Sequence, residues 1–223
     1  MLLLSADTSG KHGSIALARA DASGVRILEV VPLAGGTFSA QLIPQIAALL
    51  GQHGFTKNDL GGFIVVSGPG SFTGLRVGLA GIKALAEVLH KPIAAVSLLE
   101  AIAIASGKRG QITALLDAGR GELYVGDYEV SEDRALPVVE RIIKHEEFQA
   151  SSNRSLVVTP DQAVSESVAT SGVSVTLIPA VDAGTIAPIG FRKMQAEETV
   201  SPERLEANYI RRSDAEIFAK PRS

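Results

Sequence analysis

Apolar and polar residues alternate along the chain in a pattern typical of an α/β fold. Short apolar runs predict buried strands, at 63–66, 93–96, 156–158 and 173–178. Longer stretches with helical spacing predict helices at about Ser39 to Gly51, Leu75 to His90 and Leu98 to Ala105, near Asp161, and from Asp182 onward. Ser201 and Pro202 are typical of a helix start, and Ser131 to Pro137 are predicted to form a loop.

The segment 67–78, with the sequence SGPGSFTGLRVG, connects the strand at 63–66 to the helix near Leu75. Glycine and proline force a tight turn here, and Ser71 and Thr73 are placed to cap the first free N–H groups of the helix. A glycine-rich turn before a helix N-terminus can bind an anion. The alternative is a capped connection without a ligand, because the segment lacks the lysine of a Walker motif.

Two segments of the chain resemble each other at a spacing of 110 residues, from Asp7 to Asp117. Each is an apolar strand that ends in an aspartate, followed by a turn with glycine and a second strand, which predicts a hairpin. The repeat predicts two related domains that arose by duplication. Each aspartate either belongs to a functional cleft or caps its turn by accepting hydrogen bonds from nearby N–H groups.

The helices near Leu75 and Ser39 have narrow polar faces, which span roughly 60° and roughly 40° of the circumference. The polar residues are Arg76, Lys83, Glu87 and His90 in the first helix and Gln41, Gln45 and Gln52 in the second. Either both helices are buried within this chain or they form a contact surface for another protein. We favour the contact surface, because one sheet covers only part of a helix. Its predicted residues are Leu42, Ile46, Leu49, Val77, Gly78, Gly81, Ile82 and Leu85.

Composition narrows the classes of function. With 223 residues, 46% of them hydrophobic, the chain is long enough for one large or two small packed domains. The absence of cysteine excludes disulfides and thiolate chemistry and is compatible with the cytosol. No uninterrupted apolar run reaches the ~20 residues of a membrane span, so we expect a soluble, cytoplasmic protein. A net charge of −3 gives no broad basic surface for nucleic acid.

The basic residues that do gather lie near the end of the chain. They are Arg204, Arg211, Arg212, Lys220 and Arg222. They form either a solvated tail or an RNA contact.

The chain lacks the sequence patterns of a catalytic centre. Its histidines are His12, His53, His90 and His145, and no two are spaced as a helical metal pair. His53 and His90 are expected near helix C-termini, where a cation is favourable. Ser71 matches neither a GxSxG nucleophile nor part of a triad. We therefore expect no catalytic residue and no metal site.

Three motifs resemble the TsaB (YeaZ) family of bacterial proteins, which are needed to make threonylcarbamoyladenosine in tRNA. They are LLSADTSG at 3–10, GPGSFTGLRVG at 68–78 and LLDAGRGELYVG at 115–126. The resemblance implies an α/β fold of two ribonuclease-H-like domains, as in actin-like ATPases, that face a cleft. We expect the first domain at 1–106, the second at 107–200, and a C-terminal segment, 201–223, that packs back on the first.

The resemblance also implies partners and a site. The chain is expected to be a non-catalytic subunit that binds and activates TsaD, together with the small ATPase TsaE, through the two helices with narrow polar faces. A homodimer is the alternative in isolation, and tRNA is reached only through the complex. No tightly bound cofactor is expected, with ATP or ADP at the complex interface or in the cleft. The implied nucleotide-binding residues are Asp7, Thr8, Ser9, Gly10, Gly70, Ser71 and Asp117.

The rival functions are those of a stand-alone enzyme with an actin-like fold: an ATPase, a small-molecule kinase or a glycopeptidase-like enzyme. The missing histidine pair and a missing glycine-rich adenosine motif disfavour them. In the second hairpin, Arg120 also places a long cation where a phosphate loop usually has small residues. We therefore expect weak or no ATPase activity from this chain alone.

Overall fold

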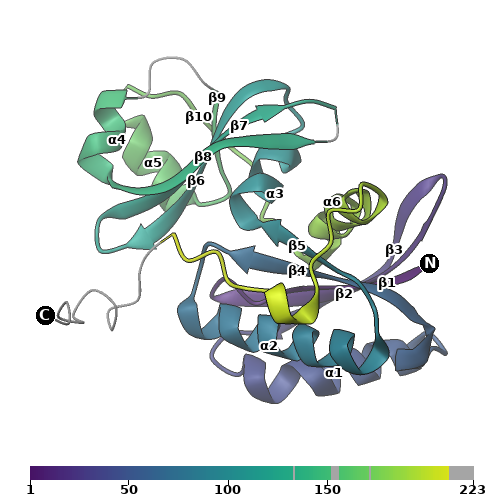
Figure 1. Ribbon diagram of the computed structural model, residues 1–223. Coiled ribbons are helices and arrows are strands. Elements are labelled where there is room, and N and C mark those ends of the chain that lie inside the picture. The colour runs from purple at the N-terminus through teal and green to yellow at the C-terminus, as the bar shows by residue number, and fades with distance from the viewer. Residues whose placement is uncertain (133, 152–155, 171, 211–223) are drawn as a thin grey trace, which may run out of the picture.

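The computed structural model describes residues 1–132, 134–151, 156–170 and 172–210, and it contains two five-stranded sheets (Figure 1). The strand order is β3-β2-β1-β4-β5 in the first sheet and β10-β9-β6-β7-β8 in the second. In the first, β1 pairs with β2 antiparallel and with β4 parallel, and in the second β6 pairs with β7 and β9 in the same way. The predicted α/β class and the two repeated hairpins are therefore confirmed.

The first sheet is built from the amino-terminal part of the chain. Its strands are β1 (Leu2–Asp7), β2 (His12–Asp21), β3 (Gly24–Ala34), β4 (Leu60–Gly68) and β5 (Ile93–Ser97). β1 is buried along its whole length, because helices cover both faces of the sheet. A strand buried on both faces needs a continuous apolar run, as Leu2 to Leu4 provide, instead of an alternating pattern.

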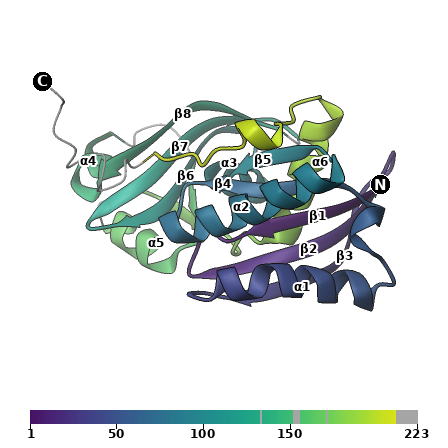
Figure 2. The same cartoon turned by 60° about the horizontal axis from the view of Figure 1, so that its bottom comes forward.

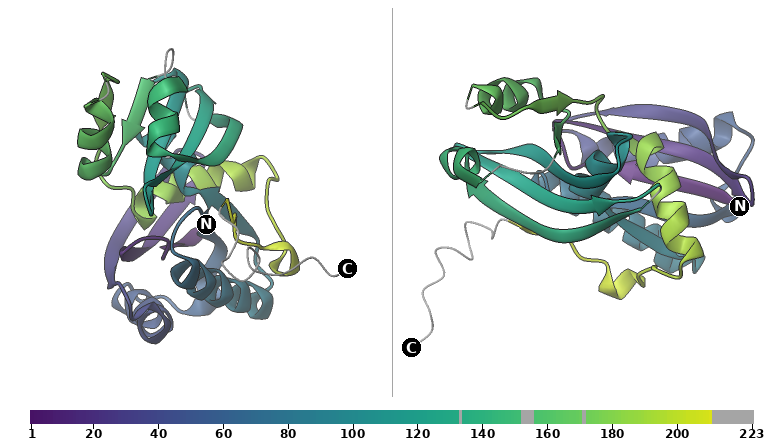
Figure 3. Two further views of the ribbon diagram at one scale, coloured as in Figure 1. Left: turned by 90° about the vertical axis from the view of Figure 1, so that its left-hand side faces the viewer. Right: turned by 90° about the horizontal axis from the view of Figure 1, so that it is seen from above.

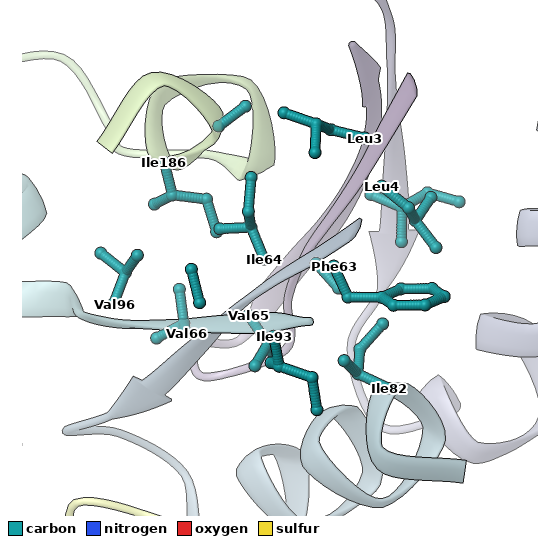
Figure 4. Close-up of a cluster of buried hydrophobic side chains, with 14 of the residues drawn as sticks. Leu3, Leu4, Phe63, Ile64, Val65, Val66, Ile82, Ile93, Val96 and Ile186 are labelled. Carbon is teal, nitrogen blue, oxygen red and sulfur yellow. The ribbon is translucent and has the colours of Figure 1, made fainter. Parts of the chain in front are cut away.

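Two helices lie side by side on one face of this sheet, and a third covers the other face (Figure 2). α1 (Phe38–Gln52) and α2 (Phe72–Leu89) share the first face, and α6 (Ala183–Gln195) lies on the second. Figure 4 shows this layering, with Ile82 of α2 and Ile186 of α6 on opposite sides of β4, the strand that carries Phe63 and Ile64. All four side chains are fully buried, so the sheet has an apolar core on each face.

The second sheet has the same arrangement of strands, and fewer residues lie in the helices that follow its strands. Its strands are β6 (Gly110–Gly119), β7 (Glu122–Val130), β8 (Ala135–Lys144), β9 (Leu156–Thr159) and β10 (Val175–Leu177), and its helices are α4 (His145–Ser151) and α5 (Gln162–Ala169). Along β6, Ile112 and Ala114 point to one core cluster and Leu115 points to the other. This alternation follows from the two-residue period of a strand.

Helices cross between the two halves of the chain (Figure 3). α3 (Leu98–Ala105) comes from the first half, yet Leu99, Ile102 and Ala103 pack in a core cluster of the second sheet. α6 comes from the second half, yet it covers the first sheet. The packing units therefore do not follow the expected limits at 106 and 200, because each sheet borrows a helix from the other half of the chain.

The predicted helices begin and end within three residues of the observed ones, and Asp161 and Asp182 cap α5 and α6 as expected. The predicted loop at Ser131 to Pro137 is wrong at its end, since β8 begins at Ala135. The helix start at Ser201 yields only a short 3₁₀ turn, η2 (Pro202–Arg204). β3 has no counterpart in the sequence prediction, because its exposed and half-buried residues show no clear alternation.

Candidate functional site

A cleft of about 960 Å³ lies between the two sheets. Its walls are the turn between β1 and β2, the turn between β4 and α2, the turn between β6 and β7, and residues 208–210 near the end of the described chain. The predicted residues Ser9, Gly10, Gly70, Ser71 and Asp117 all line it. The tertiary structure thus brings together Ser9 of the first hairpin and Asp117 of the second, which are 108 positions apart.

The first turn is held by a buried aspartate. The Ser9 amide and the Ser9 hydroxyl both donate to Oδ1 of Asp7, over 2.8 and 2.6 Å. Burial raises the pKa of Asp7 above its ordinary value of 3.8, and the two hydrogen bonds from Ser9 oppose that rise. Asp182, which caps α6, adds a weaker upward effect on the same pKa. Asp7 therefore points its carboxylate into protein and does not line the cleft.

The turn between β4 and α2 packs against the first turn, which connects β1 and β2. The Ser71 amide donates to the Ser9 carbonyl over 2.7 Å, and a Cβ at Gly70 would overlap that carbonyl. Gly70 has φ +158°, and the peptide bond from Gly68 to Pro69 is cis. These contacts explain why this connection needs glycine, since any side chain would separate the two turns.

Thr8 continues this contact along α2. Its hydroxyl donates to the Gly74 carbonyl over 2.7 Å, and a Cβ at Gly74 or Gly78 would overlap Thr8. Ser71 is the N-cap of α2, as expected, and its hydroxyl accepts a hydrogen bond from the Gly74 amide over 3.3 Å. Thr8 is 2% exposed, so it belongs to the wall behind the cleft and not to its lining.

Two backbone amides of the turns that line the cleft are already engaged within the protein. A phosphate loop offers free backbone N–H groups to its anion. Here the Ser9 amide is engaged by Asp7 and the Ser71 amide by the Ser9 carbonyl. Asp7 and Thr8 are buried and hold these turns inside the protein, and their nucleotide-binding roles stay a prediction from the family resemblance.

The second hairpin turn has a different environment. Asp117 is exposed, and its Oδ1 accepts a hydrogen bond from the Gly119 amide over 2.8 Å. Arg120 has φ +59°, a left-handed conformation that non-glycine residues seldom adopt. Asp117 thus caps its own turn at the rim of the cleft, which is one of the two roles that the sequence left open.

Some residues that line the cleft were not predicted from the sequence. The Arg76 guanidinium lies over the ring of Phe72, 3.7 Å from its centroid, and the Arg76 Nε donates to the Tyr209 hydroxyl over 3.2 Å. The Phe72 and Tyr209 rings are 5.2 Å apart. Arg76 and Phe72 lie within a conspicuous motif, but Tyr209 is 133 residues from Arg76, and no local pattern joins them.

Within the described residues, no group of three or more histidine, aspartate or glutamate side chains is arranged to hold a metal ion. His53 and His90 occupy the C-caps of α1 and α2, as expected. The same part of the chain has no helix that is long and apolar enough to cross a membrane.

The helices with narrow polar faces are more buried than expected. Five of the eight predicted contact residues lie in the core and are wrong as surface residues: Leu42, Ile46, Leu49, Gly78 and Ile82. The physical reason is that α1 and α2 pack on each other as well as on the sheet, with Gly81 against Leu42. Val77, Gly81 and Leu85 are half-buried.

Other residues of the same helices point outward and form what we call the α1–α2 face. They are Ile43, Pro44, Ala47 and Ala48 of α1 and Phe72, Ala80, Ala84 and Val88 of α2. Val88 is 68% exposed and Ile43 is 48% exposed. The surface is thus largely apolar, as the sequence indicated, with the exposed Arg76 between Phe72 and Ala80, and it is carried by the neighbours of the predicted residues.

Comparison with known proteins gives one family. A family model described as TsaD, tRNA N6-adenosine threonylcarbamoyltransferase, matches residues 30–204. The tRNA threonylcarbamoyladenosine biosynthesis protein TsaB of Bacillus subtilis is 38% identical over 131 residues, which cover 58% of this chain and 56% of that protein. TsaB of Escherichia coli is 27% identical over 96% of both chains.

Solved structures show the same fold. YeaZ from Pseudomonas aeruginosa superposes with a TM-score of 0.74 at 21% identity, over 93% of this chain and 100% of that one. A second Pseudomonas aeruginosa protein, described as similar to peptidase YEAZ, has a TM-score of 0.77 at 23% identity, over 94% and 99% of the two chains.

Proposed function

The chain belongs to the TsaB (YeaZ) branch of the TsaD family, and from this membership we propose that it takes part in making threonylcarbamoyladenosine in tRNA. It acts in the cytoplasm as a subunit without a catalytic centre of its own, and transfer of the threonylcarbamoyl group occurs on a TsaD-type partner. The family match over residues 30–204 is the observation that carries the proposal. TsaE and ATP complete the system.

The α1–α2 face is the proposed contact with the partner. It gathers exposed apolar side chains on two neighbouring helices, including Val88 and Ile43, with Ala80, Ala84 and Ala47 between them. Small side chains on adjacent helices allow another helix pair to approach closely, and burial of apolar area drives association. A second copy of this chain is the alternative occupant in isolation.

Reconstitution tests the role in tRNA. TsaD, TsaE, this protein, ATP and a source of threonylcarbamoyl-adenylate are combined with tRNA, and the nucleosides are measured by mass spectrometry. We expect modification only when this protein is present. Full modification without it would remove the case for its function, and ATP turnover by the isolated protein on the order of 1 s⁻¹, as in ordinary enzymes, would favour a stand-alone enzyme.

The contact surface is tested with a matched pair of variants. Ala84→Arg places a long charged side chain on the α1–α2 face, and Ala169→Arg makes the same change at an exposed helical alanine on α5. We expect Ala84→Arg to weaken binding to TsaD about tenfold or more, since a buried charge in an interface is costly, and Ala169→Arg to leave it unchanged. Equal affinities for two folded variants would show that the partner binds elsewhere.

A further inference from the structure

Residues 205–210, which we call the strap, run from η2 across both halves of the molecule (Figures 1 and 2). Leu205 and Ala207 pack against the core of the first sheet, and Ile210 packs against a core cluster of the second. The strap is therefore a second physical link between the two halves, in addition to the helices that they exchange.

The strap is tied to both halves at Asn208. Its amide donates to the Ser67 carbonyl at the end of β4 over 2.7 Å, and its side-chain amide donates to Oε2 of Glu140 on β8 over 2.6 Å. The other carboxylate oxygen of Glu140 accepts hydrogen bonds from Ser97, at the end of β5, and from the Tyr128 hydroxyl on β7. One carboxylate thus joins the first sheet, the second sheet and the strap.

The next residue ties the strap to the first turn of α2. The Tyr209 ring contacts the Phe72 ring at an interplanar angle of 35°, and the Tyr209 hydroxyl accepts a hydrogen bond from Arg76. Phe72 and Tyr209 are 38% and 41% exposed, so a molecule in the cleft or on the surface can reach this cluster. Phe72 also lies at the end of the α1–α2 face.

Backbone hydrogen bonds within the strap keep it compact between these contacts. The Tyr209 amide donates to the Ala207 carbonyl over 3.0 Å, and the Ile210 amide donates to the Asn208 carbonyl over 3.1 Å. Such three-residue turns hold the backbone in a compact form. Movement of Tyr209 is therefore transmitted to its neighbour Asn208, which holds Glu140.

We propose that the strap is a latch that couples contacts at the first turn of α2 to the width of the cleft. While Tyr209 contacts Phe72 and accepts the hydrogen bond from Arg76, Asn208 holds Glu140 and the two halves stay closed. A molecule that displaces Tyr209 releases Asn208 from Glu140, and the halves separate. This inference concerns the chain alone and stands apart from the partner proposed above.

Spin labels on the two halves test the latch. The chain has no cysteine, so Asn58→Cys on the first half and Ala163→Cys on α5 give two unique and exposed label positions. The distribution of distances between the labels is measured in the parent protein and in Asn208→Ala, Tyr209→Ala and the double variant. Glu206→Ala, an exposed position in the same strap, is the control.

We expect each single variant to raise the ratio of open to closed molecules about fivefold, which corresponds to the loss of one hydrogen bond. The double variant is expected to open no further than either single variant, because both residues act through one segment. Glu206→Ala is expected to match the parent. The latch is excluded if either single variant leaves the distribution unchanged, if the two effects multiply in the double variant, or if the control opens as well.

Discussion

Strand β2 is flanked by two turns that have the same local hydrogen bonds and opposite electrostatics. Before it, Asp7 accepts hydrogen bonds from the amide and the hydroxyl of Ser9, over 2.8 and 2.6 Å. At its far end, Asp21 accepts the same two bonds from Ser23 over the same two distances. Yet the pKa of Asp7 lies above 3.8 and that of Asp21 lies below it.

Burial explains the difference. Around Asp21, water solvates the carboxylate, and the hydrogen bonds from Ser23 therefore lower its pKa. Around Asp7, burial within the protein excludes water, and the resulting desolvation outweighs the same two hydrogen bonds. A local motif thus fixes the shape of a turn, whereas the elements that pack on it decide its charge and its chemistry.

The largest expected effect comes from separating the buried turn from α2. In Gly74→Ala the new Cβ overlaps the Thr8 carbonyl, a backbone atom that cannot rotate away. We expect the free energy of unfolding to fall by about 3 kcal/mol, measured by urea denaturation.

Gly51→Ala on α1 is the matched control. A Cβ there meets nothing within 4 Å, so the change is expected to stabilise the protein by about 0.5–1 kcal/mol through helix propensity. If Gly74→Ala were as harmless as this control, the close packing of α2 on the first turn would be wrong.

A smaller effect is expected from removing the charge at Asp7. The folded-state pKa of Asp7 is raised, so protonated Asp7 stabilises the folded protein relative to ionised Asp7. This contribution to the free energy of unfolding is fully present below pH 3.8 and is lost as the pH rises through the folded-state pKa. Asp7→Asn keeps an oxygen that accepts the bonds from Ser9 but cannot ionise.

We therefore expect the stability of Asp7→Asn relative to the parent to increase from pH 3.5 to pH 8 by about 1 kcal/mol or more, as measured by urea unfolding at each pH. For Asp21→Asn we expect the stability relative to the parent to decrease over the same pH range. The contribution of Asp21 to the free energy of unfolding is present above pH 3.8 and is lost as the pH falls through its lowered pKa. Parallel pH curves for the two variants would contradict the role of burial.

The smallest effect tests the hydrogen bonds that the two turns share. Ser9→Ala and Ser23→Ala each remove a hydroxyl that donates to the aspartate, so each is expected to raise the pKa of its own aspartate. Carbon-detected NMR titration of the Asp7 and Asp21 carboxyl groups measures both. A lowered pKa in either variant would show that the hydroxyl does not stabilise the carboxylate.

Much of the local structure could be predicted from the sequence. The hairpins, the helices and the caps at Ser71, Asp161 and Asp182 follow from short-range patterns, because turn residues and hydrophobic spacing act over a few positions. The glycine-rich turn was recognised as special in the same way. An exposed apolar surface does lie on α1 and α2, the helices that the sequence indicated, while five of the eight residues predicted for it are buried.

What only the tertiary structure decided is how these pieces pack. Burial depends on contacts between distant segments, such as Thr8 with Gly74 or Tyr209 with Arg76, and no local period encodes them. For that reason the sequence could offer Asp7 and Asp117 as equivalent aspartates of a repeat. Tertiary packing made the first a buried structural residue and left the second an exposed cap at the rim of the cleft, since desolvation is a property of the surroundings and not of the motif.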